Sequence, residues 1–273
     1  MAPRLIALDM DGTLLDDNSQ VPEEFWPLLR HAQEQGVAIA PASGRQLATL
    51  QDMFASEHTG VDVEPTSYIA ENGTVVFHDG KIVSTTVIDK EAVRRVLEAR
   101  TQIRADSDFV LCTPEMAYLL DSTPESTRKQ VRNYYRATTY VGDLDAVAAE
   151  HDIIKIAIYC AAGTEEHVAP AMFAAVPDQD VAISGAVWLD VMARGANKGV
   201  ALTNMARALD IPVSDTVAFG DFLNDYELLD AAGTAVAMEN AHPKLKAIAD
   251  RIAPPNTEAG VITVLREMLG LKA

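Results

Sequence analysis

Short apolar runs alternate with segments of helical periodicity over the first part of the chain. An apolar run ends abruptly at Asp9, and the apolar positions of the next segment recur every three or four residues until Gly36. Such a pattern predicts a buried strand followed by a helix. In chain order we expect strand 5–8, helix 22–35, strand 37–42, a helix to about 57, strand 67–70, an Asn72-Gly73 hairpin turn and strand 74–77.

The last part of the chain repeats this alternation. The elements expected there are strand 189–192, helix 198–209, strand 216–219, helix 223–231, strand 234–238, helix 242–252 and helix 260–269. Strands that alternate with helices are typical of a parallel sheet covered on both faces. We therefore predict an α/β fold with a doubly wound parallel sheet.

The middle of the chain has a different character. Its β-like runs cover 83–88, 109–112, 117–120 and 153–160, and its helical stretches cover 91–104, 125–136 and 165–176. No strand there ends in an acidic residue followed by glycine. We interpret 84–186 as an α/β domain inserted into a domain formed by 1–83 and 187–273.

Composition narrows the class of protein. The 273 residues are 48% hydrophobic and carry a formal net charge of −18, from 22 Lys and Arg against 40 Asp and Glu. That hydrophobic content argues against disorder, and the acidic balance argues against nucleic acid and anionic membranes as partners. No apolar run approaches the length of a membrane span, and no secretory signal is recognised. Cys112 and Cys160 are expected to be reduced thiols of a cytoplasmic protein, either a monomer or a homodimer.

Polar clusters follow four of the predicted strands. They cover 9–13, 43–45, 195–198 and 220–225. In an open parallel sheet, ligands bind outside the carboxyl ends of the strands. We therefore expect these distant segments to meet at one edge of the sheet.

The charges in these clusters indicate a metal site. Asp9, Asp11, Asp221 and Asp225 would lie close together, and crowded carboxylates need a proton or a cation. Carboxylate oxygens are the ligands that Mg²⁺ prefers, usually together with water and phosphate. The sequence therefore predicts Mg²⁺ as the cofactor.

The other groups in these clusters suit a phosphoryl group. Lys198 supplies a positive charge, Ser43 a hydroxyl, and the turns at Gly12 and Gly44 expose backbone N–H groups that can cradle an anion. A carboxylate in such a site can attack phosphorus and form an aspartyl-phosphate. A second carboxylate two residues later can protonate the leaving oxygen and then activate water.

These segments resemble the motifs of the haloacid dehalogenase (HAD) superfamily of phosphatases. Asp9-Met10-Asp11-Gly12-Thr13 is similar to the first motif, Ser43-Gly44-Arg45 to the second, Asn197-Lys198-Gly199 to the third, and Gly220-Asp221-Phe222-Leu223-Asn224-Asp225 to the fourth. The inserted segment, Glu71-Asn72-Gly73 before it and Glu258-Ala259-Gly260-Val261 near the end resemble the Cof-like branch. The resemblance covers the chain in the expected order and implies a Rossmann-like core with an inserted α/β cap.

The resemblance also implies a role for each residue. Asp9 would be the nucleophile and a Mg²⁺ ligand. Asp11 would be the general acid and base and would offer its carbonyl to the metal. Asp221 would be the other protein ligand, and Asp225 would hold a metal-bound water or orient Lys198. The phosphoryl oxygens would be bound by Ser43, Lys198 and Asn224, and the cap would contact the leaving group. Arg45 would contact the substrate or pair with a carboxylate of the fold.

At two positions the residue differs from the one that is usual in the Cof-like branch. Ser43 stands where a threonine is usual, which keeps the hydroxyl. Glu239 stands before Asn240-Ala241 where glycine is usual. If that position needs a positive φ, Glu239 is strained there; if not, it adds a negative charge near the site.

The function predicted is therefore that of a phosphatase. We expect a Mg²⁺-dependent phosphomonoester hydrolase acting on small phosphorylated metabolites, such as sugar phosphates or phosphorylated cofactors. Two alternatives stay open: a phosphosugar mutase of the same superfamily, and a non-catalytic signalling protein phosphorylated on Asp9. A mutase usually offers a basic cap, whereas the cap arginines here are interspersed with acids and indicate a solvated helix face.

Overall fold

The structure is a computed structural model that describes residues 3–271. The chain divides into two compact units. We call the first the core unit: it extends to Gly44, includes Leu50–Ser84 and resumes at Asn197. The second, the cap unit, contains Arg45–Thr49 and Thr85–Ala196. The predicted domain limits of 84 and 186 stay a prediction.

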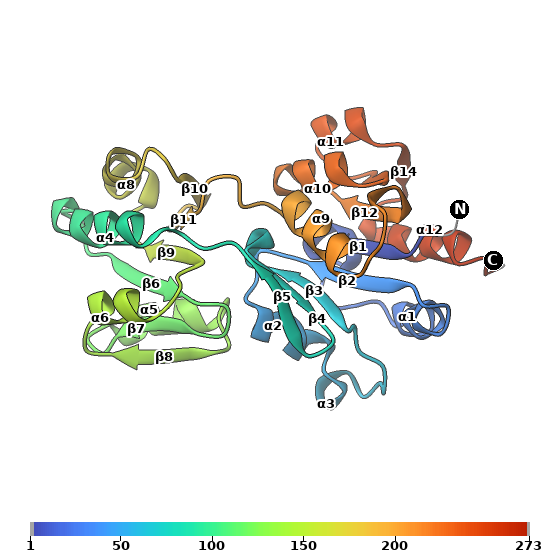
Figure 1. Ribbon diagram of the computed structural model, residues 1–273, viewed down its shortest axis with the longest axis horizontal. Helices are drawn as coiled ribbons and strands as arrows, with labels where there is room; N and C mark the ends of the chain where they lie inside the picture. The colour runs from blue at the N-terminus through green and yellow to red at the C-terminus, as the bar shows by residue number, and fades with distance from the viewer. Residues whose placement is uncertain (1–2, 272–273) are drawn as a thin grey trace. The chain divides into compact units, whose positions relative to one another are not determined.

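The core unit holds one sheet and the helices that cover it (Figure 1). Its elements are β1 (Leu5–Asp9), α1 (Phe25–Glu34), β2 (Ala38–Ala42), α2 (Leu47–Phe54, of which the first turn belongs to the cap unit), α3 (Ser56–Thr59), β3 (Ser67–Ala70), β4 (Val75–His78), β5 (Lys81–Thr85), α9 (Lys198–Ala208), β12 (Thr216–Gly220), α10 (Tyr226–Ala231), β13 (Thr234–Met238), α11 (Pro243–Ile248), β14 (Arg251–Ala253) and α12 (Gly260–Met268).

The order of the core sheet is β14-β13-β12-β1-β2-β3-β4-β5. The six strands from β14 to β3 run parallel, and β1 at the centre is buried along its whole length. Helices α9, α10 and α11 pack together on one face, and α1 packs with α12 on the other. The apolar run of β1 follows from this burial on both faces. The predicted fold class is confirmed.

Four local predictions in this unit need correction. The helix expected over 242–252 ends at Ile248, because Arg251 pairs with Val236 and starts the edge strand β14. The helix expected to run to about 57 is interrupted at Ala55, which is extended. β3 and β4 do form the predicted hairpin, but Ala70 pairs with Val75, so the turn holds four residues instead of two. The strand expected over 83–88 lies at Lys81–Thr85 and belongs to the core sheet.

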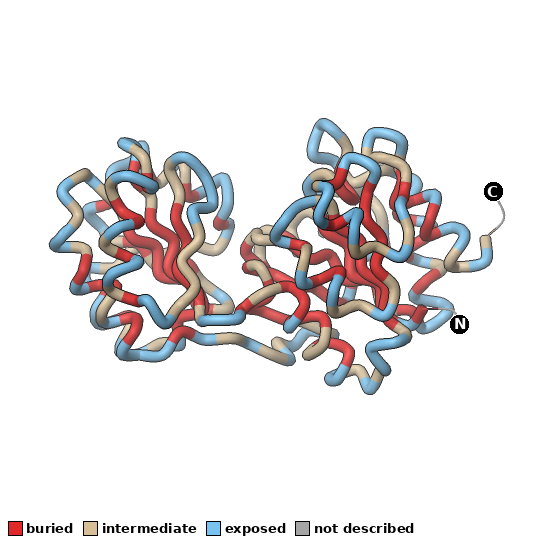
Figure 2. Tube along the Cα trace, turned by 90° about the horizontal axis from the view of Figure 1, so that it is seen from above, coloured by how far each residue is buried: buried red, intermediate tan, exposed pale blue. Residues whose placement is uncertain are grey.

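The cap unit holds a second sheet, in the order β10-β11-β9-β6-β7-β8. Its elements are α4 (Lys90–Ala99), β6 (Asp108–Cys112), β7 (Ala117–Leu120), α5 (Glu125–Arg132), β8 (Thr138–Val141), α6 (Leu144–Glu150), β9 (Lys155–Tyr159), α7 (Thr164–His167), α8 (Ala169–Ala175), β10 (Asp180–Gly185) and β11 (Trp188–Met192). Strands β8 and β10 and helix α6 were not predicted from the sequence. Each unit has a buried core of its own around its sheet (Figure 2).

The strand at 189–192 belongs to this second sheet. Its expected place in the parallel core sheet is wrong, because β11 pairs antiparallel with both β9 and β10. Leu189 and Val191 face a cluster formed by α4, α6 and α8. An apolar run of this length has the same appearance in either sheet, so only pairing decides its place. Cys112 and Cys160 in this unit are both buried, and neither forms a disulfide.

Candidate active site

The carboxyl ends of three adjacent strands bring the predicted polar clusters together. β12, β1 and β2 are neighbours in the core sheet and run parallel, with Leu8 paired to Phe219 and Asp9 paired to Ala42. Asp9, Ser43 and Asp221 therefore stand at one edge. A cavity of about 430 Å³ opens there. Its lining residues are Asp9, Asp11, Gly12, Ser43, Gly44, Asp221, Phe222 and Asn224.

Lys198 lies beneath this cavity. Its Nζ donates to Oδ1 of Asp9 and to Oδ1 of Asp225, each over 2.6 Å, and its side chain is fully buried. The position is fixed by the start of α9, where Oδ1 of Asn197 accepts a hydrogen bond from the backbone N–H of Val200. Asn197 is thus the N-cap that places Lys198 on the first helical turn.

Asp225 supports the loop that follows β12. Its Oδ2 accepts hydrogen bonds from the backbone N–H groups of Asp221 (3.2 Å) and Phe222 (3.3 Å), while its Oδ1 accepts from Lys198. Both oxygens are therefore engaged within the protein. The contact with Lys198 is the one that an orienting role for Asp225 requires, and its role in holding a metal-bound water stays a prediction.

The turn after β1 closes against Asp221. Gly12 has φ +76°, and a Cβ atom there would lie 2.3 Å from Oδ2 of Asp221. Only glycine combines that backbone conformation with so close an approach. Oγ1 of Thr13 donates to Oδ1 of Asp221 over 3.4 Å. The turn therefore determines where the Asp221 carboxylate lies relative to Asp9.

Two asparagines outside the predicted set hold the same turn. Nδ2 of Asn240 donates to the carbonyl of Gly12 over 2.8 Å, and Nδ2 of Asn256 donates to the carbonyl of Leu15 over 3.0 Å. Asn240 also accepts from the backbone of Asn256. In the sequence this segment stands out only through Glu239, and no local signal marks Asn240 or Asn256. Glu239 itself has no positive φ, so it is not strained there.

Ser43 and Arg45 lie in different surroundings. Ser43 is buried, and its backbone donates to Ile69 and accepts from Asn72, which fixes it against the β3–β4 turn. Asn72 itself does not line the cavity. Arg45 is not among the lining residues either, and it is grouped with the cap unit. The assignment of Arg45 to the substrate stays a prediction.

Crowding of carboxylates in a buried place shifts their proton affinities. Burial, together with the charge of Asp225, raises the pKa of Asp9 to about 8, although Lys198 opposes this shift. Burial and Asp225 also raise the pKa of Asp221 to about 6. Burial lowers the pKa of Lys198, but Asp9 and Asp225 outweigh it and hold that pKa above its ordinary value. The site thus contains a charged lysine and carboxylates in need of a further positive charge.

The donor set fits a hard divalent cation. One oxygen from each of Asp9, Asp221 and Asp225 can be chosen so that all three lie within 4.8 Å of one another. Oxygen ligands in this number are typical of Mg²⁺, which usually keeps part of its water shell. In residues 3–271 this is the one group of His, Cys, Asp or Glu side chains so arranged.

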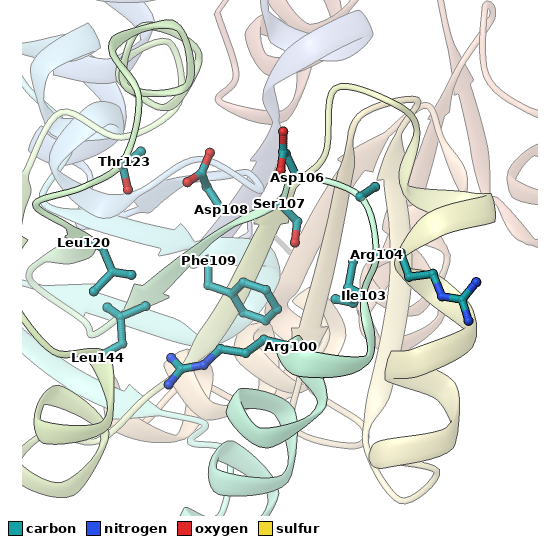
Figure 3. A pocket seen from close by; sticks show the side chains of 11 residues that line it. Arg100, Ile103, Arg104, Asp106, Ser107, Asp108, Phe109, Leu120, Thr123 and Leu144 are labelled. Carbon is teal, nitrogen blue, oxygen red and sulfur yellow. The ribbon is translucent and has the colours of Figure 1, made fainter.

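A second cavity, of about 310 Å³, lies within the cap unit (Figure 3). Phe109, Leu120 and Leu144 form its apolar wall. Two of its charged side chains have partners in the fold, because Arg100 pairs with Asp145 over 2.6 Å and Asp108 accepts from Thr127 over 2.7 Å. Arg104 points away from it. We assign no ligand to this cavity.

Comparison with known proteins identifies the family. The family model described as haloacid dehalogenase-like hydrolase matches residues 6–265. The chain belongs to the haloacid dehalogenase-like hydrolases. The resemblance to the Cof-like HAD phosphatases is thereby confirmed, as is the prediction of an enzyme of the phosphatase class. The non-catalytic alternative is set aside.

Similarity to this HAD family extends over nearly the whole chain. The chain is 30% identical to 5-amino-6-(5-phospho-D-ribitylamino)uracil phosphatase YbjI of Escherichia coli, over 98% of this chain and 97% of that protein. It is 29% identical to phosphatase YwpJ of Bacillus subtilis, over 97% of this chain and 100% of that protein. The solved structure of a haloacid dehalogenase-like hydrolase from B. subtilis is 27% identical, with a TM-score of 0.74, and the match covers 96% of this chain and 99% of that one.

Within residues 3–271 of this HAD chain, no helix is both long and apolar enough to cross a bilayer.

Proposed function

We propose that this HAD phosphatase is a Mg²⁺-dependent phosphomonoester hydrolase that acts on small phosphorylated metabolites through an aspartyl-phosphate on Asp9. The observation that carries the proposal is the placement of Asp9, which lines the cavity, in contact with the buried Lys198 and beside Asp221. A cytoplasmic location fits such substrates and the two cysteines that form no disulfide.

The first half of the reaction makes one bond to Asp9. A carboxylate oxygen of Asp9 attacks phosphorus, and the bond between phosphorus and the ester oxygen breaks. The leaving oxygen takes a proton from Asp11, which is exposed in the same cavity two residues away. The alcohol departs and the phosphoryl group stays on Asp9.

The second half restores the enzyme. Asp11, now ionised, accepts a proton from a water molecule, whose oxygen attacks phosphorus while the bond to Asp9 breaks. Inorganic phosphate leaves, and Asp9 regains its carboxylate. Because both steps need Asp11 in opposite protonation states, it serves once as acid and once as base.

Polar groups around Asp9 bind the negatively charged phosphoryl oxygens. Lys198 and the hydroxyl of Ser43 would contact them, and Asn224 and the backbone at Gly12 and Gly44 lie along the same cavity. Asp9, Asp221 and the carbonyl of Asp11 would hold Mg²⁺, and Asp225 would orient Lys198. A bound Mg²⁺ would supply positive charge that keeps Asp9 ionised and offsets charge on the transferring group.

The substrate class rests on relatives. YbjI carries the name of a ribitylaminouracil phosphatase, and a protein of Cronobacter sakazakii that is 28% identical, over 89% of this chain and 87% of that protein, is named HMP-PP phosphatase. Both names describe small phosphorylated molecules. We propose small phosphorylated molecules as the substrate class of this chain. We propose no single substrate.

The mutase alternative receives no support from the cap. A mutase needs free basic side chains for a second phosphate, whereas several cap arginines are paired with carboxylates: Arg95 with Asp178, Arg100 with Asp145 and Arg132 with Glu125. Arg94 bridges Glu91 and Glu98 on one helix face.

Phosphate release from a panel of phosphorylated metabolites tests the proposal. We expect release with Mg²⁺, none with EDTA, and none from Asp9→Asn. Asp230→Asn is the matched control, because Asp230 is exposed on α10. Mass spectrometry of Asp11→Asn after incubation with an aryl phosphate, whose oxygen leaves without a proton from Asp11, should show one added phosphoryl group on the peptide that contains Asp9. Metal-independent release, or full activity of Asp9→Asn, would contradict the proposal.

A further inference from the structure

Phe222 is the most exposed large apolar side chain in the part of the chain that the structure describes. Its exposed fraction is 58%, and that of Leu223 beside it is 40%. Aromatic side chains bury large areas in most proteins, so an exposed ring is the informative exception. This ring lines the cavity that contains Asp9.

The ring is held in its exposed position. The backbone N–H of Phe222 donates to Oδ2 of Asp225 over 3.3 Å, with φ −123° and ψ 174°. The ring of His242 meets it edge to face, with centroids 6.2 Å apart and an interplanar angle of 87°. Nδ1 of His242 in turn accepts from the backbone N–H of Lys244, and the backbone N–H of His242 donates to the carbonyl of Asp221.

Among the residues that line this cavity, Phe222 is the one with a large apolar side chain. The others are carboxylates, an asparagine, a serine and two glycines, which suit a phosphoryl group and a cation. An apolar ring contributes nothing to those charged groups. It can, however, offer a flat surface to the part of a substrate that lies beyond the phosphoryl group.

We propose that Phe222 determines specificity by stacking against a flat ring in the leaving group, so that the preferred substrates are phosphomonoesters whose alcohol carries a planar or aromatic ring near the ester oxygen. This inference rests on the proposed hydrolysis at Asp9. Because Asp225 holds the backbone of Phe222 and the ring packs edge to face on His242, less conformational freedom is lost when a substrate stacks on the ring.

Benzyl phosphate and ethyl phosphate test the proposal, because both are alkyl esters and they differ in the ring. Stacking on an aromatic side chain predicts that the ratio of kcat/KM for benzyl over ethyl phosphate falls about tenfold in Phe222→Ala. Phe222→Tyr, which keeps a flat ring, should retain the wild-type ratio. Leu223→Ala removes the adjacent exposed side chain, which does not line the cavity, and should change the ratio less than about twofold.

Binding of benzylphosphonate and ethylphosphonate, measured by calorimetry with Mg²⁺, gives a second readout that needs no turnover. The preference for benzylphosphonate should fall in Phe222→Ala to the same extent. An unchanged ratio in Phe222→Ala, or an equal loss for both esters, would overturn the proposal. If the wild type hydrolyses neither ester nor any other phosphomonoester, the hydrolysis itself is refuted, and the phosphonate ratio alone then decides whether Phe222 recognises a ring.

Discussion

Nζ of Lys198 lies 2.6 Å from Oδ1 of Asp9, although 189 residues separate the two in the chain. The same ammonium group contacts Asp225, and the side chains of Lys198 and Asp225 are completely buried. A buried charge costs several kcal/mol unless it is paired. Lys198 is therefore the group that offsets the negative charge of both carboxylates, which ties the stability of the core unit to its chemistry.

Removal of the lysine should destabilise the protein as well as inactivate it. In Lys198→Met the carboxylates of Asp9 and Asp225 lose their shared partner, and breaking a buried pair costs about 3–5 kcal/mol of unfolding free energy. We expect kcat/KM to fall by a factor of at least about 10²–10³, as it does when an enzyme loses one group that stabilises charge in the transition state. Thermal unfolding and phosphate release measure the two effects. Lys246→Met, on the exposed side of α11, is the control, and similar behaviour of the two variants would contradict the role of Lys198.

Asp9→Asn should separate folding from catalysis. The amide oxygen of asparagine can still accept a hydrogen bond from Lys198, so the fold is retained. The amide is a poor nucleophile, and we expect kcat to fall by about 10⁴ or more. Circular dichroism and thermal unfolding should resemble the wild type. An unfolded variant would show that Asp9 is chiefly structural, and an active one that it is not the nucleophile.

The position of Asp221 should depend on the glycine at 12. In Gly12→Ala the new Cβ would meet Oδ2 of Asp221 at 2.3 Å and would also require φ +76°. Gly36→Ala is a matched control, because Gly36 has φ +71° and nothing within 4 Å of the added atom. Both variants should lose about 1–2 kcal/mol from the backbone conformation. Only Gly12→Ala should weaken the binding of Mg²⁺. The measurement is the Mg²⁺ concentration that gives half-maximal activity, which should rise in this variant alone. Equal Mg²⁺ requirements would exclude a metal role for this contact.

Stability without metal should fall as pH rises from about 5 to about 8.5. The pKa of Asp9 is raised to about 8 and that of Asp221 to about 6, chiefly by burial, from an ordinary value of 3.8. A carboxyl with a raised pKa binds its proton more tightly in the folded state. It therefore stabilises the fold fully below the unfolded pKa, and this contribution is lost as pH rises through the folded pKa.

Melting temperatures of the protein in EDTA measure this loss, and added Mg²⁺ should restore most stability at the alkaline end. Exposed carboxyls such as Asp62 and Asp178 have lowered pKa values, so they act in a separate window at and below about pH 4. In Asp221→Asn, the melting temperature should depend less on pH near pH 6 than it does in the wild type. A metal-free melting temperature that rises between pH 5 and pH 8.5 would contradict the assignment.

The sequence by itself determined the class of fold and the residues at the candidate site. Apolar runs that end in Asp9 and Gly220 mark buried parallel strands, and such strands place whatever follows them at one sheet edge. That rule alone predicts that Asp9, Ser43, Lys198 and Asp221 lie close together. Motif resemblance then identified the HAD family, which the family model confirms.

Tertiary structure alone decided which sheet a strand joins and what surrounds each carboxylate. The run at Trp188–Met192 pairs with β9 and β10 through backbone hydrogen bonds, which its side-chain pattern does not encode. The engagement of both Asp225 oxygens, the support of the Gly12 turn by Asn240 and Asn256, and the exposure of Phe222 arise from contacts between segments far apart in the chain. Local sequence carries propensity and periodicity, whereas these features depend on how distant segments pack.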